Sequence, residues 1–466
     1  MSIRLRPYQD KFINDIRLEF GQGHRRVCGI MPCGAGKTVA TGWMAGRAAE
    51  RGKKVIFMVH RRELVEQTSQ TFAAMGIPHG LIASGAEPCY ELPVQIASVY
   101  TLAHRLGDGL HPDLLICDEC HHSTAGTYKA ILDRWPSMYV LGVTATPQRT
   151  DGTGLSDVFQ SMVEGPTANE LIRMGNLSPE RAYTLPSSAR IDRSKFRIRH
   201  GDYVMGDVAK AMDDANIFGD IIGHYQKLIP GKRAICYCIT REYSAKLAGR
   251  FQAAGIPSAH VDCKTPKKER ERAVSDFREG RVSVLCNVDL FGEGFDVPAM
   301  DAVMLARPTA SLILHIQQTM RCMRPDPAHP DKTAIILDHV GNIQKHGLPE
   351  MDRAWSLESK KRKQAAPPVK TCPQCYLTVA ASVKVCPACG YAWPQADGEG
   401  DTRRKAVEDE TVALVRVDPH AKFLRRMRVA GMLEKACTMQ DLYNIAAYAG
   451  YKPGWAYYQA KAKGIR

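Results

Sequence analysis

The stretch "GIMPCGAGKTVATGWM", residues 29–44, follows a short apolar run and places four glycines around a Lys-Thr pair. A buried strand, a glycine-rich corner and a helix that begins at Lys-Thr are typical of a phosphate-binding loop. Gly34 and Gly36 would let the backbone N–H groups approach phosphate oxygens, where the positive end of the helix dipole also points. Lys37 would then reach the β- and γ-phosphates of a nucleotide, and Thr38 would ligate Mg²⁺.

One departure from the general pattern leaves an alternative open. The motif G-x-x-x-x-G-K-[ST] begins with a glycine, but Met31 stands at that position. An ordinary turn between a strand and a helix is therefore the competing interpretation of this stretch alone.

A second stretch, "LLICDECHH" at 114–122, ends an apolar strand with adjacent carboxylates. Open α/β sheets bind ligands at the carboxyl ends of their strands. Asp118 would hold Mg²⁺ through its hydration shell, and Glu119 would accept a proton from the water that attacks the γ-phosphate. The alternatives are a surface acidic corner or a metal site at His121 and His122. The phosphate loop upstream favours an ATP site.

The composition is that of a globular, multidomain protein. The chain has 466 residues, 44% of them hydrophobic, so about three units are expected. Its 63 Lys/Arg against 49 Asp/Glu give a net charge of +14, which favours a polyanionic partner, with nucleic acid ahead of a membrane surface. The start "MSIRLRPYQD" lacks the apolar core of a signal peptide, and no apolar run approaches the roughly 18 residues of a membrane span. We expect a cytoplasmic protein with no membrane partner.

Short apolar runs that alternate with amphipathic stretches predict an α/β fold with parallel sheets. One set of runs predicts a first lobe over residues 1–165, and a second set predicts another lobe over 216–345. The polar segment between them, 166–215, is predicted to be a connector or small insertion.

After the second predicted lobe the composition changes. Residues 346–371, which include "KKRK", read as a basic linker. Residues 372–393 contain two cysteine pairs, and 394–466 read as a charged spacer followed by a basic tail with helical periodicity.

The two cysteine pairs predict a structural zinc ribbon. "CPQC" and "CPAC" contribute Cys372, Cys375, Cys386 and Cys389. Four thiolates from two tight turns suit tetrahedral Zn²⁺ in a closed site, which is structural rather than catalytic. Two disulfides are the alternative. The basic segments on both sides suggest a grip on nucleic acid, and docking to another protein is equally consistent with them.

Several ordered motifs resemble those of superfamily 2 helicases. In the first half they are "RPYQ" (6–9), "PCGAGKT" (32–38), "VHRRELVEQ" (59–67), "DECH" (118–121) and "TATP" (144–147). In the second half they are "CNVDLFGEGFDVP" (286–298) and "QQTMRCMR" (317–324). The resemblance covers roughly residues 3–345 and implies two tandem RecA-like lobes that bind ATP between them.

The resemblance implies roles for residues of the first lobe. Arg6 and Gln9 would read adenine. Lys37, Thr38, Asp118 and Glu119 would carry out hydrolysis. The residues expected to couple the ATP site to nucleic acid are His121, Thr144 and Thr146.

In the second lobe, Gly294 and Asp296 match the fifth motif, which faces the nucleotide. Gln317 matches the leading glutamine of the sixth motif, and Arg321 and Arg324 match its arginine fingers. Met320 stands where a glycine normally precedes the first arginine, and a bulkier side chain there could displace Arg321, so the sequence leaves open which of the two arginines is the finger. Solvated surface arginines are the alternative for this pair, and an ordinary turn is the alternative for the fifth motif.

Arg61, Arg62 and Thr101 match segments that touch nucleic acid in the family. Contacts of this kind reach the phosphates and are independent of sequence. For any one arginine, a solvated helix face is an equally good interpretation.

Within the superfamily, "DECH", "GEGFDVP" and the trailing cysteine pairs look most like bacterial RadD-type and phage-borne helicases, and also like the motor subunits of restriction enzymes. This resemblance implies an ATP-dependent helicase or translocase on DNA, single-stranded or branched, with ATP, Mg²⁺ and structural Zn²⁺ as cofactors. It also implies a place in repair or recombination, with a recombination or replication protein as a partner of the C-terminal region. The alternatives are a remodeller of branched DNA that unwinds little, an ATP-gated binding module, and an RNA helicase.

Overall fold

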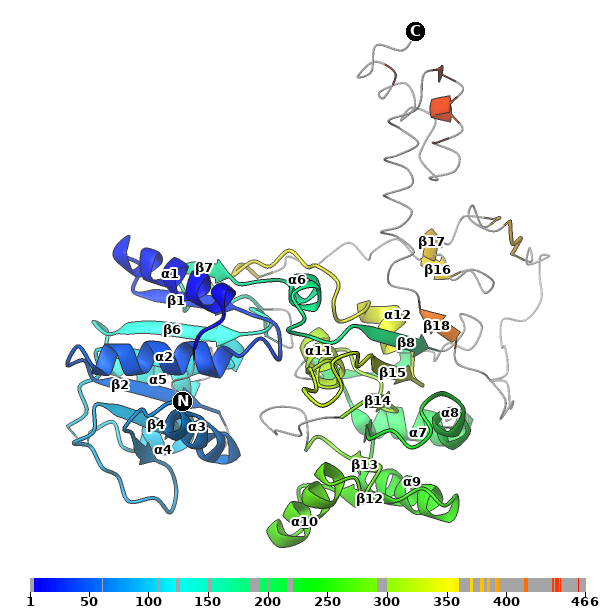
Figure 1. Cartoon of the computed structure of the whole chain (residues 1–466), viewed down its shortest axis with the longest axis horizontal. Helices are drawn as coiled ribbons and strands as arrows, with labels where there is room; N and C mark the ends of the chain where they lie inside the picture. Colours follow the sequence, from blue (N-terminus) through cyan, green and yellow to red (C-terminus); the bar gives the residue numbers. More distant parts are fainter. Residues whose placement is uncertain are drawn as a thin grey trace.

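The computed structural model describes residues 4–60, 62–107, 109–122, 126–149, 153–184, 193–199, 201–215, 221–290 and 300–359, and short stretches at 369–371, 378–380, 384–385, 390–393 and 415–417, with a few positions between 438 and 460. Two α/β lobes lie side by side in Figure 1, the first in blue and cyan and the second in green and yellow. The sequence predicted both lobes. None of the helices in the described part of the chain is long and apolar enough to cross a membrane.

The first lobe is built on a parallel sheet of seven strands in the order β3-β4-β2-β5-β6-β1-β7. The strands are β1 (Arg26–Ile30), β2 (Val55–Val59), β3 (Gly80–Ile82), β4 (Val94–Ser98), β5 (Leu114–Asp118), β6 (Tyr139–Thr144) and β7 (Ser161–Glu164). The helices are α1 (Pro7–Gly21), α2 (Lys37–Ala49), α3 (Arg62–Ala74), α4 (Val99–His104) and α5 (Gly126–Arg134).

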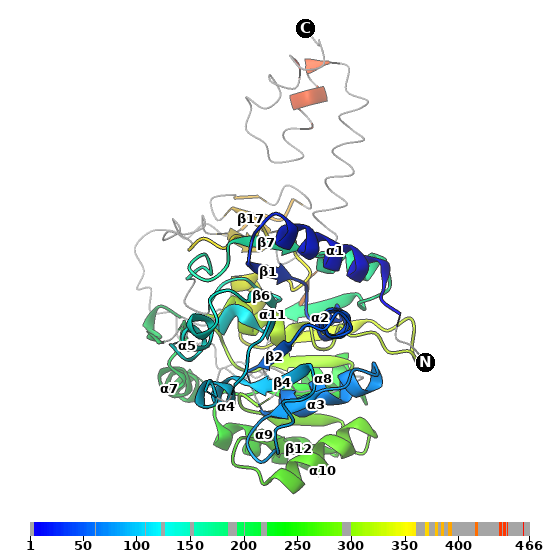
Figure 2. The same ribbon diagram turned by 90° about the vertical axis from the view of Figure 1, so that its left-hand side faces the viewer.

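Helices cover both faces of this sheet, with α2 and α3 on one side and α4 and α5 on the other (Figure 2). Every residue of β2, β4 and β5 is buried, which is why these strands read as continuous apolar runs rather than as alternating ones. The loops at the carboxyl ends of β1 and β5 therefore open at one edge of the sheet, where the phosphate loop and the acidic pair lie.

The segment predicted as a connector contributes a strand to the second sheet. Its elements are α6 (Ala168–Arg173), β8 (Glu180–Thr184), η2 (Arg193–Lys195), β9 (Ile198–Arg199), β10 (Asp202–Tyr203) and α7 (Met205–Ala215). β8 pairs in parallel with β15 of the second lobe. The short β9–β10 hairpin is held by Asp202, whose carboxylate binds the Arg307 guanidinium at 3.0 Å and accepts from the Thr309 hydroxyl at 2.8 Å.

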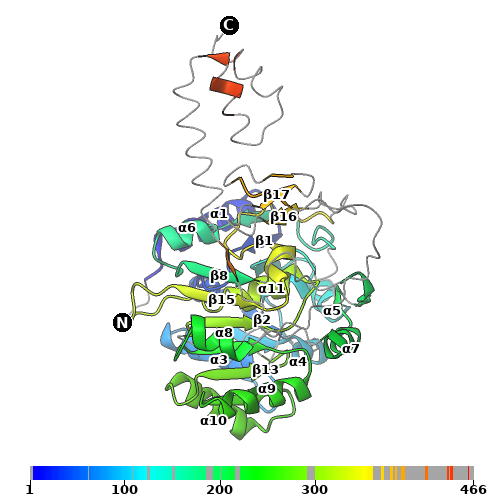
Figure 3. The same ribbon diagram turned by 90° about the vertical axis from the view of Figure 1, so that its right-hand side faces the viewer.

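The second lobe also has a sheet of seven strands, in the order β12-β13-β11-β14-β15-β8-β18. Figure 3 shows this lobe from its own side. All described pairs are parallel except β18, which runs antiparallel to β8. The strands are β11 (Ala234–Tyr237), β12 (Ser258–Val261), β13 (Val284–Asn287), β14 (Ala302–Leu305), β15 (Ala334–Asp338) and β18 (Val415–Val417). The helices are α8 (Ile221–Leu228), α9 (Arg241–Ala253), α10 (Lys267–Arg278), α11 (Leu312–Thr319) and α12 (Asn342–His346).

Alternation along the second sheet divides its core into two layers. Cys236 and Met304 pack with residues of α8 and α9, whereas Ile235 and Val303 pack on the opposite face with Phe277 of α10. Both faces are covered, as expected of a parallel sheet.

The chain after α12 does not begin as a linker. Residues 349–359 run from the second lobe back toward β7 of the first, in yellow in Figure 1. Farther on, β16 (Val369–Thr371) and β17 (Thr378–Ala380) form an antiparallel pair. The basic "KKRK" segment and most of the tail lie outside the described residues.

Gly142, in the centre of β6, leaves no room for a side chain. A Cβ added there would lie 2.3 Å from Cζ of Phe159 and 2.8 Å from Cβ of Cys120. Gly142→Ala should therefore lower the free energy of unfolding of the first lobe by about 2 kcal/mol, as overpacking does, in a urea titration followed by circular dichroism.

Gly249→Ala is the matched control, because Gly249 lies inside α9 and nothing lies within 4 Å of an added Cβ. Alanine should stabilise this helix by about 0.5–1 kcal/mol. Equal effects of the two substitutions would contradict the packing around β6.

Candidate nucleotide site between the lobes

The phosphate loop has the backbone that its glycines predict. Gly34 and Gly36 adopt left-handed φ angles of 84° and 78°, and α2 begins at Lys37. The Lys37 ammonium donates to the carbonyl of Met31 at 3.3 Å. The Met31 side chain is fully buried in the core, so the departure from the motif is absorbed by packing behind the loop.

Gln9 supports this loop from α1. Its Nε2 donates to the carbonyls of Ala35 and Gly36 at 3.3 and 3.2 Å. The backbone N–H of Arg6 donates to Gln9 Oε1 at 2.9 Å. A Cβ at Gly36 would lie 2.5 Å from Gln9 Nε2, so the loop and α1 fit only with glycine here. The recognition of adenine by Arg6 and Gln9 stays a prediction.

The acidic pair follows β5 at the same edge of the sheet. Asp118 is buried, and burial first, with the charge of Glu119 second, raises its pKa to about 7. Glu119 has a φ of 50°, a conformation that costs free energy in a residue with a Cβ and is found where function requires it. Its carboxylate lies 3.9 Å from the Lys37 ammonium.

The three residues expected to couple the ATP site to nucleic acid are in direct contact with this acidic pair or with each other. His121 Nδ1 lies 3.3 Å from Glu119 Oε2 and 3.1 Å from the Thr144 hydroxyl. The Thr144 hydroxyl accepts from the Thr146 N–H at 3.1 Å. All three side chains are buried, so a movement of the Thr144–Thr146 loop shifts the partners of the Glu119 carboxylate.

The second lobe completes the site from across a cleft. The cleft has a volume of about 680 Å³, within the 300–1,000 Å³ of ordinary ligand pockets. From the first lobe it is lined by Gly34, Gly36, Lys37, Thr38, Asp118 and Glu119, and from the second by Gln317, Arg321 and Arg324. Cγ of Arg324 lies 3.7 Å from the position of a Cβ on Gly34. The sequence predicted these residues in three separate motifs, and the fold brings them to one cleft.

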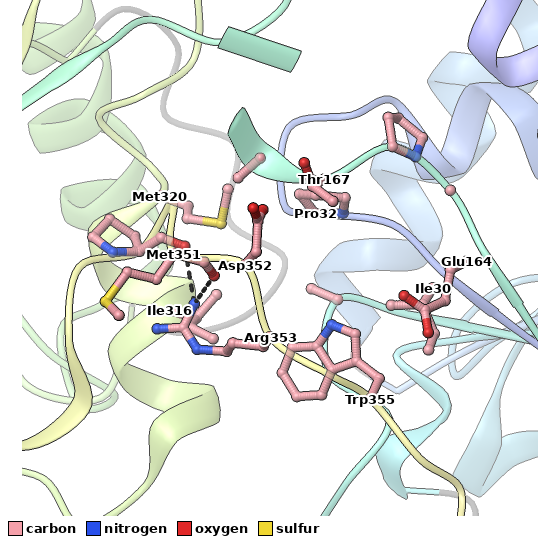
Figure 4. Close-up of a pocket in the computed structure, with 15 residues that line it drawn as sticks. Ile30, Pro32, Glu164, Thr167, Ile316, Met320, Met351, Asp352, Arg353 and Trp355 are labelled. Carbon is pink, nitrogen blue, oxygen red and sulfur yellow. Dashed lines mark hydrogen bonds between the residues drawn. The ribbon is translucent and has the colours of Figure 1, made fainter. Parts of the chain in front are cut away.

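Met320 does not displace Arg321 from the cleft. The Met320 side chain is buried and lines a small pocket between the lobes, beside Thr167 and Pro32 (Figure 4). Arg321 and Arg324 both line the cleft, and the assignment of either as the arginine finger stays a prediction.

The donor set fits Mg²⁺. The Asp118 carboxyl and the Thr38 hydroxyl both line the cleft next to the loop, and Mg²⁺ prefers one or two such oxygens together with water and phosphate. Bound there, Mg²⁺ would offset the charge of the phosphates.

Several predicted site residues cannot be placed in the same way. Gly294, Asp296, Arg61 and the cysteines at 372, 375, 386 and 389 lie outside the described residues. Arg62 is the first residue of α3. Thr101 lies in α4, and its hydroxyl accepts from Ser98 at 2.8 Å. The predicted contacts with nucleic acid stay predictions.

One side of the cleft was not predicted from the sequence. It is lined by polar residues of α3, namely Gln67, Thr68, Gln70 and Thr71. Their spacing of one helical turn in "EQTSQT" was the signal that could have found them.

The fold and the site define a nucleoside triphosphatase with two lobes, both of which contribute to one cleft. Comparison with known proteins gives the family. Residues 2–149 match the family described as "Type III restriction enzyme, res subunit", and residues 217–326 match "Helicase conserved C-terminal domain".

A "51.5 kDa protein" of a Lactococcus phage is 40% identical over 392 residues, 82% of each chain. "Putative ATP-dependent helicase IRC3" of Saccharomyces cerevisiae is 29% identical over 364 residues, which cover 72% of this chain and about half (51%) of the yeast protein. The solved structure of the "ATP-dependent Type ISP restriction-modification enzyme LlaBIII bound to DNA" shares the fold with a TM-score of 0.54 and 17% identity over 72% of this chain and 28% of that one.

The chain belongs to the superfamily 2 helicases, with a restriction-type first lobe and a helicase C-terminal second lobe. It is an enzyme of the ATP-hydrolysing helicase and translocase class.

The raised pKa of Asp118 predicts an effect of pH on stability. The folded chain holds the Asp118 proton more tightly than the unfolded chain does, so stability falls as pH rises from the ordinary carboxyl pKa to about 7. Asp118→Asn removes this cost. Its gain in melting temperature should be several degrees larger at pH 7.5 than at pH 5, equivalent to about 2–3 kcal/mol.

Asp113→Asn is the control with the opposite sign. Asp113 accepts from the N–H of Lys54, which lowers the pKa of its carboxyl, so asparagine should lose a little stability at neutral pH. An increase in melting temperature for Asp118→Asn that is the same at pH 5 and at pH 7.5 would contradict the raised pKa of the buried Asp118 carboxyl.

Proposed function

We propose that this ATPase is a motor that moves along DNA. The observation that carries the proposal is the single cleft in which Lys37 and Glu119 of one lobe face Arg321 and Arg324 of the other. Charges that stabilise the transferring phosphoryl group act only when both sets are close to it. Hydrolysis is then linked to closure of the lobes, and each cycle of closing and opening can become a step.

The residues of the site divide the chemistry between them. Lys37 and the loop N–H groups hold the phosphates, and the arginines balance the charge that develops at the γ-phosphate. Glu119 takes the proton of the attacking water. His121 and Thr144, at 3.3 and 3.5 Å from Glu119 Oε2, orient that carboxylate.

The choice of DNA rests on charge and on the relatives. The net charge of +14 suits a polyanion. The structural neighbour LlaBIII was solved bound to DNA. We propose single-stranded or branched DNA as the track, and a resemblance to RadD-type helicases that rests on "GEGFDVP" and the two cysteine pairs. A recombination or replication protein as partner and a cytoplasmic location are parts of the same proposal.

We also propose that the four cysteines hold structural Zn²⁺. Two described pairings support this. β16 pairs with β17 on either side of the segment that contains Cys372 and Cys375, and Val385 pairs with Ala392 on either side of Cys386 and Cys389. Each C-x-x-C thus lies between residues that pair in antiparallel fashion, and its spacing is that of the ligands of structural Zn²⁺ sites.

Glu119→Gln tests the motor. DNA-stimulated ATP turnover should fall by at least 10²-fold, because the base is lost, while binding of a fluorescent ATP analogue is retained. Glu87→Gln, at an exposed position, is the control and should turn over as the parent does. Equal turnover in Glu119→Gln would overturn the assignment.

The substrate is tested by strand displacement. Stimulation of ATPase activity by DNA should exceed that by RNA of the same sequence, and forks should be separated faster than flush duplexes. ATP hydrolysis with movement but no displacement would indicate a translocase that remodels DNA. Stimulation by RNA alone would overturn the choice of DNA.

The zinc proposal is tested by metal analysis. Purified full-length chain should contain about one Zn²⁺, and Cys375→Ser should lose it. Cys89→Ser, at an exposed cysteine of the first lobe, should keep it. Zinc content that is unchanged in Cys375→Ser would refute the site.

A further inference from the structure

Residues 349–359 cross from the second lobe to the first and are named the interlobe strap here. At its beginning the strap is fixed to the second lobe by Arg353. The Arg353 guanidinium donates to the carbonyls of His346 and Leu348 at 3.2 and 2.9 Å, and to those of Pro349 and Met351 at 3.2 and 2.9 Å. One side chain thus binds four carbonyls, from the last residue of α12 to the start of the strap.

The end of the strap is fixed to the first lobe through its backbone. The carbonyl of Leu357 accepts from the N–H groups of Leu155 and Ser156 at 2.7 and 3.0 Å. The N–H of Gly154 donates to the Ser359 hydroxyl at 3.0 Å. A Cβ at Gly154 would lie 2.0 Å from the Leu357 carbonyl oxygen, so the two backbones are in direct contact.

Trp355 lies between these two anchors, in the pocket of Figure 4. The pocket is lined by residues in or next to three helicase motifs: Ile30 and Pro32 at the start of the phosphate loop, Ala145 of "TATP", and Met320 of the sixth motif with Ile316 just before that motif. Trp355 also packs against two hydrophobic clusters, one that lies in the first lobe and one that contains residues of both lobes. It does not line the nucleotide cleft among the described residues.

Met320 connects the pocket to the cleft. It is the one described residue that lines both, and Arg321 follows it directly in the chain. Arg321 is therefore joined, through its neighbour in the chain, to the pocket that Trp355 lines.

We propose that Trp355 and the interlobe strap are positioning elements for ATP hydrolysis, which hold the arginines of the sixth motif against the phosphate loop through Met320. This inference rests on the hydrolysis of ATP in the cleft and not on the choice of DNA. Trp355 acts through Arg321 and touches no phosphate. Its removal should lower the rate of hydrolysis more than the affinity for nucleotide, because a misplacement of about 1 Å can cost 10²-fold in rate.

Trp355→Ala in the full-length chain should lower kcat for DNA-stimulated ATP hydrolysis by about 10–100-fold, with KM changed less than about threefold. Binding of ADP with aluminium fluoride, which mimics the transferring phosphoryl group, should weaken in parallel with kcat, whereas binding of ADP alone should not. Trp355→Phe, which keeps an aromatic ring and disturbs folding less, should restore much of the rate. Unchanged kcat in both variants would overturn the proposal.

A double-mutant cycle with Arg321→Ala separates positioning from a general loss of structure. If Trp355 acts through Arg321, Trp355→Ala should have little further effect on kcat in the Arg321→Ala background. Losses that multiply would overturn the proposal. Trp43→Ala, which removes a tryptophan stacked on Arg17 and Arg47 of the first lobe, is the matched control and should leave the preference for ADP with aluminium fluoride over ADP unchanged.

If Glu119→Gln abolishes hydrolysis and Trp355→Ala does not alter it, the function stands and this inference fails. If neither substitution alters it, the cleft is not the site of hydrolysis.

Discussion

The gathering of charged side chains from two lobes in one cleft is the constraint on which the rest of the structure depends. Lys37 lies on one side and Arg324 on the other, and the charge of Arg324 opposes that of Lys37. Burial also lowers the pKa of Lys37, but Cys33, Glu119 and Asp118 together raise it by more, so the pKa of Lys37 is raised overall. Asp118 is itself costly to ionise where it is buried. An anion with several charges, such as a triphosphate, balances the site better than the protein does alone. Binding and loss of the γ-phosphate therefore change the force between the lobes.

The fold could be predicted to the extent that buried strands give continuous apolar runs. Strands such as "VIFMV" and "LLICD" are buried on both faces, and the sequence predicted them directly. β8 was missed because "ERAYT" is buried at alternate residues and lies near the edge of its sheet, so its pattern resembles a polar connector. The pairing of strands in a sheet depends on packing between residues that are distant in the sequence. No local sequence pattern contains that information.

The features of the candidate site also fall into those that the sequence predicts and those that it does not. The phosphate loop and the acidic pair could be predicted because glycine, lysine and carboxylates occur there at fixed spacings for chemical reasons. The contacts of Gln9 with the loop could not, since they join residues 26 and 27 positions apart. The interlobe strap was not predicted because of the basic composition of the segment that contains it. "KKRK" dominates residues 346–371, so the whole segment read as a solvated linker, although Trp355 and Leu357 at its start are typical of a packed chain.

The two crossings of the chain between the lobes have a mechanical consequence. The polypeptide passes from the first lobe to the second after β7 and returns along residues 349–357, and both passages line one pocket. A single flexible crossing would allow one lobe to rotate about three axes relative to the other. Two crossings that are each anchored by hydrogen bonds restrict this rotation to one axis, which is the line that joins the two crossings. The free energy of ATP hydrolysis in the cleft then drives rotation of the lobes about this one axis instead of about several axes.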